Sequence, residues 1–298
     1  MITVQSLTKR YGRRTAVDDM SFDVAAGRVT GFVGPNGAGK STTMRMMVGL
    51  TRPDQGDVRY HGISYTRLLQ PARVVGSVLD ARCMHPGRTA RNHLRATASL
   101  SGIAPRRVDE VVHEVGLDSA ADQRAGGFSL GMRQRLALAG ALLGEPEVLL
   151  LDEPSNGLDP DGIRWLRNSL SDFADRGGTV FVSSHLIAEL AMFADDLVVV
   201  GGGKLIAAEP VATTLARGDS TVLVRTPHTS ELARLLDLHR ITVDVAGDRL
   251  TAHGTTTAVV SQLVFEHRVQ VIEITESSRS LEEILLDMTG ASAEFAAA

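Results

Sequence analysis

The chain has 298 residues, 43% of them hydrophobic and 22% charged, without a low-complexity block, which is the composition of a globular protein with a sizeable core. Its formal net charge of −4 gives no electrostatic reason to expect a nucleic-acid partner, because such a partner normally requires a basic surface. Apolar runs such as Val148–Leu151 and Leu197–Val200 are far shorter than the roughly 20 residues of a membrane-spanning helix.

The first elements along the chain predict a small antiparallel sheet, because Thr3–Leu7 and Ser21–Val24 alternate apolar and polar residues. Three nearly continuous apolar runs follow, at Val29–Val33, Val148–Leu151 and Val180–Val182. Runs of this kind suit a parallel sheet that is buried on both faces.

Helical patterns lie between these strands, over Ser41–Val48, Ala90–Leu100, Pro105–Val115, Gly131–Leu143, Gly162–Ala174 and Leu186–Phe193. Strands that alternate with helices predict a three-layer α/β domain. The stretch from about residue 81 to residue 143 is mostly helical, and we expect it to form a subdomain inserted between two core strands.

A glycine-rich loop directly follows the first core strand. It reads Gly34-Pro35-Asn36-Gly37-Ala38-Gly39-Lys40-Ser41 and opens the next helix, in which Thr42 lies. Such a loop wraps its backbone N–H groups around phosphate at the positive end of a helix. We expect Lys40 to contact the β- and γ-phosphates, and the Ser41 hydroxyl to bind Mg²⁺. The loop therefore predicts nucleotide binding.

Two carboxylates end the strand Val148–Leu151. The carboxyl ends of parallel strands are where α/β sheets place their ligands. Asp152 is predicted to hold Mg²⁺, directly or through a water, and Glu153 to polarise the attacking water. On its own the pair could be no more than an acidic turn, but the phosphate loop makes a hydrolytic site the better interpretation.

After Gly218 the pattern changes to a second, smaller α+β domain. We expect strands at Thr221–Arg225, Thr242–Ala246, Arg249–Ala252 and Val269–Ile274, and helices at Ser230–Leu238 and Thr256–Glu266. The order βαββαβ matches a ferredoxin-like unit. A last helix is expected at Ser280–Met288. The predicted domains are 1–218, 219–290 and a tail at 291–298.

With these motifs in place, the chain resembles the ATP-binding subunit of an ABC transporter from Met1 to about Arg217. Phe128–Arg135 is similar to the family's signature segment, and Ser155–Asp159 is similar to its D-loop. His185 stands where the family has its switch histidine, and Tyr11 where an aromatic side chain stacks on adenine. The resemblance therefore implies the P-loop ABC ATPase fold.

The resemblance also implies roles for residues that have simpler explanations. Ser129 and Gly131 would contact ATP held by a second copy of the chain, with Asp159 nearby, in a head-to-tail homodimer. Ser129 and Asp159 are equally suited to cap the helices that follow them. His185 alone could be a strand-end residue, and Tyr11 alone a surface aromatic.

The sequence departs from the family pattern at two places. Asp80 stands where the family has a glutamine that touches Mg²⁺ and the membrane partner, so it is a candidate Mg²⁺ and nucleotide residue or else part of a surface turn. The signature has Leu130 for Gly and Met132 for Gln. Together with Ser280–Glu283, this variation resembles exporters of the antibiotic-resistance type, including the daunorubicin-resistance subfamily.

Three functions compete at this point. The first is a transport motor that hydrolyses ATP at the cytoplasmic face of the cell membrane and drives export of a drug, antibiotic or lipid-like substrate through a separate permease. The second is a soluble ABC ATPase that acts on the ribosome or DNA, but the chain has one phosphate loop and no sustained heptad run. The third is a GTPase switch, which gives no reason for Phe128–Arg135 or His185. The transport motor is preferred.

Overall fold

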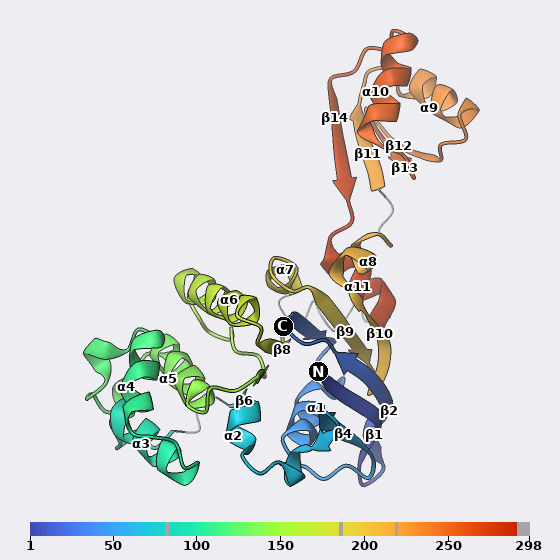
Figure 1. Cartoon of the computed structure of the whole chain (residues 1–298). Helices are drawn as coiled ribbons and strands as arrows, with labels where there is room; N and C mark the ends of the chain where they lie inside the picture. Colours follow the sequence, from blue (N-terminus) through green and yellow to red (C-terminus); the bar gives the residue numbers. More distant parts are fainter. Residues whose placement is uncertain (81–83, 185–186, 218–219, 291–298) are drawn as a thin grey trace. The chain divides into compact units, whose positions relative to one another are not determined.

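The computed structural model describes residues 1–80, 84–184, 187–217 and 220–290. The chain divides into two compact units (Figure 1). One contains residues 1–211 together with the chain from Leu286 onward, and the other contains residues 212–285. The second unit is therefore an insertion near the end of the first. The domain limits 1–218 and 219–290 remain a prediction.

The first unit begins with an antiparallel sheet whose strand order is β2-β1-β4-β5. Its strands are β1 (Ile2–Tyr11), β2 (Arg14–Val24), β4 (Gln55–Tyr60) and β5 (Ile63–Ser64). The predicted antiparallel sheet is confirmed, although β1 and β2 are longer than the alternating segments suggested. β1 and β2 form a tight hairpin in which Tyr11 and Arg14 are register partners.

The central sheet has the strand order β10-β9-β3-β8-β7-β6. Its strands are β3 (Val29–Val33), β6 (Val75–Val78), β7 (Val148–Leu151), β8 (Thr179–Ser183), β9 (Asp196–Gly201) and β10 (Lys204–Pro210). All neighbours are parallel except β10, which runs antiparallel to β9. Every residue of β3, β7 and β8 is buried, as predicted from their continuous apolar runs.

Three aromatic rings join the two sheets. Phe22 of β2 lies 6.0 Å from Phe32 of β3 and 5.8 Å from Phe181 of β8, measured between ring centroids. Phe32 and Phe181 stack at 4.9 Å. Aromatic pairs at these separations add stabilisation beyond the area they bury. The antiparallel sheet is thereby fixed against the strand that leads into the glycine-rich loop.

Helices connect the strands of the first unit, and among the described residues no helix is both long and apolar enough to span a bilayer. Their bounds are α1 (Lys40–Met47), α2 (Pro71–Val74), α3 (Ala90–Leu100), α4 (Arg106–Glu114), α5 (Leu130–Leu142), α6 (Pro160–Asp175), α7 (Ile187–Leu190) and α8 (Val211–Leu215), with α8 reaching the second unit. The expected helices occur with shifted ends, and α7 is shorter than expected.

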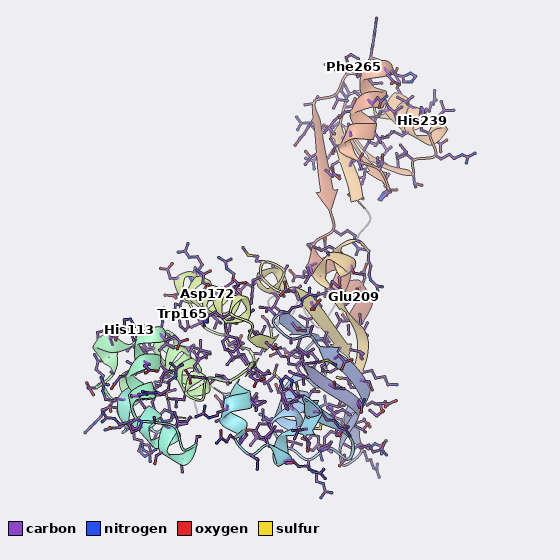
Figure 2. All side chains as sticks on the ribbon, viewed as in Figure 1. His113, Trp165, Asp172, Glu209, His239 and Phe265 are labelled. Atoms are coloured by element: carbon purple, nitrogen blue, oxygen red, sulfur yellow. The ribbon has the colours of Figure 1, made fainter. Side chains whose placement is uncertain are left out.

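The predicted helical subdomain consists of α3, α4 and α5, which gather beside the β6 edge of the central sheet (Figure 1). Its link to α6 includes a cation–π contact. The guanidinium carbon of Arg135 on α5 lies 4.0 Å from the ring centroid of Trp165. Trp165 itself lies on α6 and is labelled in Figure 2. Arg135 also donates a hydrogen bond of 2.8 Å to the carbonyl of Val115, next to α4.

The second unit contains a four-stranded antiparallel sheet with the strand order β12-β13-β11-β14. Its elements are β11 (Ser220–Arg225), α9 (Thr229–Leu238), β12 (Val243–Ala246), β13 (Arg249–His253), α10 (Thr257–Glu266), β14 (Glu273–Ser278) and α11 (Leu281–Thr289), whose last residues belong to the first unit. Each βαβ segment is split by a strand of the other, which is the predicted ferredoxin-like arrangement.

The last strand of this sheet was predicted wrongly at Val269–Ile274, since β14 begins at Glu273. Val269 instead closes the end of α10, where its N–H bonds to the carbonyl of Val264, and its side chain is buried in the core of the unit. The apolar residues at the start of the predicted strand therefore belong to the connection between α10 and β14, where they pack against the core. The mostly polar residues that follow form β14 and pair with β11.

The Ser280–Glu283 segment has a local structural explanation. Ser280 precedes α11, and its hydroxyl accepts a hydrogen bond of 3.2 Å from the Glu283 N–H. In return the Glu283 carboxylate accepts a bond of 2.8 Å from the Ser280 N–H. This reciprocal arrangement is a capping box, which satisfies two N–H groups that a helix start leaves unpaired.

Candidate functional site

The glycine-rich loop connects β3 to α1, and two of its glycines are required by close backbone approach. Gly39 has φ +100°, and a Cβ there would collide with the carbonyl of Ala16 on β2. A Cβ on Gly34 would collide with the carbonyl of Val200 on β9. The loop is thus held between two strands, with the positive end of α1 at its carboxyl side.

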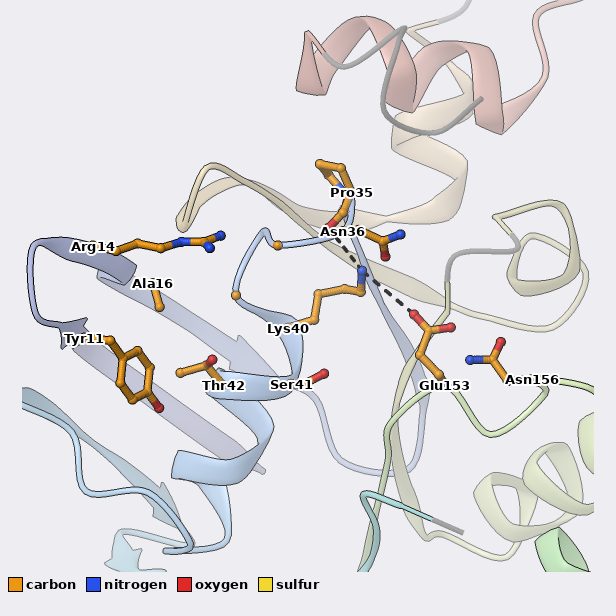
Figure 3. A pocket seen from close by; sticks show the side chains of 12 residues that line it. Tyr11, Arg14, Ala16, Pro35, Asn36, Lys40, Ser41, Thr42, Glu153 and Asn156 are labelled. Atoms are coloured by element: carbon orange, nitrogen blue, oxygen red, sulfur yellow. Dashed lines mark hydrogen bonds and ion pairs between the residues drawn. The ribbon is translucent and has the colours of Figure 1, made fainter. Parts of the chain in front are cut away.

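A cavity of about 570 Å³ opens beside this loop (Figure 3). Most of its lining was predicted: Tyr11, Pro35, Asn36, Gly37, Gly39, Lys40, Ser41, Thr42 and Glu153. These residues come from β1, the loop, the start of α1 and the turn after β7. The fold therefore assembles one concave site from three distant parts of the sequence.

The Lys40 side chain is a buried cation of this cavity, and only 7% of its surface is exposed. Its Nζ donates hydrogen bonds to the carbonyls of Gly34, at 2.6 Å, and Pro35, at 3.3 Å. It also lies 3.9 Å from Oε1 of Glu153. Burial lowers the pKa of Lys40, and the charges of Glu153 and Asp152 oppose that shift. The carboxylates thus favour the charged ammonium.

The acid pair follows β7 at the carboxyl edge of the central sheet. The Asp152 N–H continues the sheet by donating to the carbonyl of Val78 on β6, at 2.8 Å. Glu153 then turns the chain in the left-handed region, with φ +48°. This turn directs the Glu153 carboxylate toward Lys40 (Figure 3).

Three predicted residues, Ser129 and Gly131 of the signature segment and Asp159 of the D-loop, lie outside the cavity lining. Ser129 is the N-cap of α5, and its hydroxyl accepts from the N–H of Met132 at 3.2 Å. Asp159 is the N-cap of α6 and accepts from Gly162 at 2.8 Å. The capping explanation therefore holds for both. Gly131 lies in the first turn of α5.

Two further predicted residues, Asp80 and Ala38, differ in their exposure. Asp80 follows β6 and is exposed, and it is not among the residues that line the cavity. Ala38, by contrast, is buried beneath the loop at 2% exposure. His185 lies outside the described residues.

The cavity lining also contains Arg14 and Ala16, which the sequence analysis missed, and Asn156, which it included in the D-loop segment but did not predict as a site residue. The Arg14 guanidinium reaches the middle of the loop, where its Nη2 lies 3.1 Å from the position a Cβ would take on Gly37. A signal for Arg14 was available. Tyr11 was already a candidate, and the hairpin makes Arg14 its register partner.

The oxygen groups around the loop fit a small, hard cation. Ser41 lines the cavity, and Asp152, which is not among the lining residues, is close enough for its charge to act on Lys40. Among the described residues, no group of three or more His, Cys, Asp or Glu side chains could hold a metal by itself. This donor set is typical of Mg²⁺, which usually takes one or two protein ligands and completes its shell with water and substrate phosphates.

Comparison with known families identifies two matching regions. Residues 17–156 match the model of the family described as "ABC transporter". Residues 220–282 match a "Domain of unknown function (DUF8746)". The two matches fall in the first and second compact units, respectively.

Comparison with individual proteins gives relatives of nearly the same length. An uncharacterized ABC transporter ATP-binding protein, YhcH of Bacillus subtilis, is 36% identical over 297 residues, which cover 99% of this chain and 97% of YhcH. The bacitracin transport ATP-binding protein BcrA of Bacillus licheniformis is 34% identical and covers 97% of both chains. The lantibiotic transport ATP-binding protein SrtF of Streptococcus pyogenes is 34% identical over 69% of this chain and 89% of SrtF.

Solved structures have the same fold over the first part of the chain. The ATP-binding subunit of an ABC transporter is 26% identical, with a TM-score of 0.66 over 73% of this chain and 92% of that subunit. A dimeric ATP-binding cassette bound to ADP and Pi is 23% identical, with a TM-score of 0.65 over 71% of this chain and 99% of that cassette.

Proposed function

The chain belongs to the ATP-binding subunits of ABC transporters, and from this premise we propose that it hydrolyses ATP to drive export through a separate membrane permease. The observation that carries the proposal is the single cavity in which the glycine-rich loop, Lys40 and Glu153 meet. ATPase activity follows from the family. Its coupling to export, and the roles of the individual residues, are the proposal.

We assign the nucleotide contacts as follows. The loop 34–41, with Thr42, binds the triphosphate through its N–H groups and through the Lys40 ammonium, while Tyr11 stacks on the adenine. Mg²⁺ would be held by Ser41 and Asp152, with Asp80 close by, and would neutralise charge on the phosphates. Glu153 accepts the proton of the attacking water, and His185 contacts the γ-phosphate.

A head-to-tail homodimer completes this site. Ser129, Gly131 and Asp159 lie outside the cavity of their own chain, which supports the proposal that they face the nucleotide of a second copy. Solved cassettes of similar fold are dimeric. Two-fold symmetry then creates two equivalent composite sites from one gene product. Closing of the dimer around ATP, followed by its release after hydrolysis, would move the permease.

The permease would reside in the membrane and this chain would bind at its cytoplasmic face. Relatives that transport bacitracin and lantibiotics support a substrate of the antibiotic or lipid-like class. They give no support to the ribosome or DNA alternative.

Replacing Arg14 by alanine is expected to weaken ATP binding, because the guanidinium reaches the loop that would hold the phosphates. Loss of one charge-assisted contact on an open cavity wall corresponds to an increase in Kd of about threefold to tenfold. Titration with a fluorescent ATP analogue measures this change. Arg13→Ala is the control, since Arg13 directly precedes Arg14 in the hairpin and does not line the cavity. Equal affinities for the two variants would contradict the assignment.

The transport proposal is tested by reconstituting the chain with its permease in inside-out vesicles. A fluorescent amphipathic peptide antibiotic is added to the solution outside the vesicles. We expect ATP-dependent uptake into these vesicles. Uptake should vanish when the same preparation carries Glu153→Gln. Robust ATP hydrolysis without uptake of either a peptide antibiotic or a lipid analogue would contradict the proposed substrate class, while hydrolysis itself would remain.

A further inference from the structure

Ser183 is the last residue of β8, the strand that separates β3 from β7. It therefore stands between the strand that carries the glycine-rich loop and the strand that carries the acid pair. On one side Ser183 is the register partner of Phe32 in β3. On the other, Leu151 of β7 pairs with Val182, so Asp152 follows beside Ser183. The Ser183 side chain is completely buried.

The Ser183 hydroxyl binds both members of the acid pair. It donates to Oδ1 of Asp152 at 2.6 Å and accepts from the backbone N–H of Glu153 at 2.9 Å. A serine hydroxyl has one proton to donate. Because an ionised carboxylate can only accept, the proton lies on the Asp152 side, and the direction of both bonds is fixed.

These two bonds fix different features of the turn after β7. The bond to Asp152 engages one carboxylate oxygen and holds the side chain in one orientation, which leaves the second oxygen for other ligands. The bond to the Glu153 N–H secures a left-handed backbone, φ +48°, that a residue with a side chain seldom adopts. The direction of the Glu153 carboxylate depends on that backbone.

From this geometry we propose that Ser183 is a positioning residue for magnesium-dependent ATP binding and hydrolysis, acting through Asp152 and Glu153. The inference rests on the proposed function, since it takes Asp152 as the Mg²⁺ ligand and Glu153 as the base. Residues that orient a metal ligand through a hydrogen bond commonly change metal affinity or activity by about 10- to 100-fold when removed. Ser183 has this relation to Asp152.

The test compares Ser183→Ala with Ser183→Thr, which retains a hydroxyl. Ser169→Ala is the control, because the Ser169 hydroxyl is partly buried and donates to the backbone carbonyl of Trp165, away from the acid pair. For each protein the Kd for ATP is measured in EDTA and in saturating Mg²⁺. The Mg²⁺ concentration that gives half-maximal ATPase rate is then measured, with kcat.

We expect Ser183→Ala to bind ATP in EDTA with wild-type affinity, to lose most of the affinity gained on adding Mg²⁺, and to need about 10-fold more Mg²⁺ for half-maximal rate. Its kcat should fall by about 10- to 100-fold. Ser183→Thr should recover most of each loss, and Ser169→Ala should match the wild type. Should the alanine variant be insoluble, Ser183→Cys keeps the shape of the side chain with a larger atom that is a weaker donor, and it should shift the Mg²⁺ dependence in the same direction.

If Ser183→Ala retains the full gain in ATP affinity that the wild type shows on adding Mg²⁺, the role of Ser183 is overturned and the proposed function stays intact. Equal impairment of the alanine and threonine variants would also overturn it, because the hydroxyl would not be the acting group. If the Kd of the wild type for ATP is the same in EDTA and in saturating Mg²⁺, the proposed function is refuted, and the inference with it.

Discussion

Lys40→Ala is expected to raise the Kd for ATP by about 100-fold or more, because it removes a buried charge that would otherwise pair with phosphate. The Lys40 ammonium is already in place before any ligand binds. The carbonyls of Gly34 and Pro35 accept hydrogen bonds from it, and the Glu153 carboxylate lies 3.9 Å away. A cation held in this way loses little further freedom when an anion arrives, so most of its attraction contributes to affinity.

Isothermal titration with ATP and Mg²⁺ measures this loss. Lys204→Ala is the matched control, since Lys204 is an exposed lysine that pairs with Asp18 away from the cavity. The control should bind like the wild type. An affinity of the Lys40 variant within about threefold of the wild type, a difference below 1 kcal/mol, would contradict the assignment of the phosphate loop.

Glu153→Gln is expected to retain ATP binding and to lower kcat by roughly 10²–10⁴-fold, the usual contribution of a general base. Glutamine keeps the size of the side chain but cannot take a proton from water. The substitution also removes a negative charge that lies near Lys40. ATP affinity should therefore be unchanged or higher, because the Lys40 ammonium no longer interacts with the Glu153 carboxylate and more of its charge acts on the phosphates.

Single-turnover hydrolysis with radiolabelled ATP separates this effect on chemistry from any effect on binding. Glu147→Gln provides the control, since Glu147 directly precedes β7 but forms a surface pair with His61. Turnover by Glu153→Gln that remained within about threefold of the wild type would remove Glu153 from the role of base.

Local sequence patterns were sufficient for the core of this protein. β3 and β7 were predicted with their observed bounds, because parallel strands buried on both faces consist of uninterrupted apolar residues. The glycine-rich loop is equally local, since its motif, the strand before it and the helix after it are contiguous. The acid pair follows for the same reason from its place at the end of β7.

Elements without a continuous apolar run were harder to predict. β4 begins with Gln55, Gly56 and Asp57, and β10 alternates between half-buried and exposed residues. Both are defined by the strands beside them more than by their own composition. β14 was predicted to start too early for a different reason. The segment before it contains apolar residues such as Val269, which pack in the core of the second unit although they belong to a connection and not to a strand.

The missing members of the site are products of the tertiary fold. Arg14 reaches the loop only because the β1–β2 hairpin packs against it, and Ser183 meets the acid pair only because β8 lies between β3 and β7. Neither residue belongs to a motif that can be read along the chain. The strand order β3-β8-β7, which short sequence patterns do not encode, determines the Ser183 contact, whereas the Arg14 contact depends on the packing of a local hairpin.

The contact between Arg135 and Trp165 should allow the intrinsic tryptophan fluorescence to report on the position of α5 relative to α6. Trp165 is the only tryptophan of the chain, so all indole emission comes from one position on α6. A guanidinium 4.0 Å from the ring centroid gives that indole a neighbour on α5, and indole emission responds to nearby charge and to water. Any nucleotide-driven shift of α5 relative to α6 should therefore alter the intrinsic fluorescence of the unlabelled protein, in real time and without a dye.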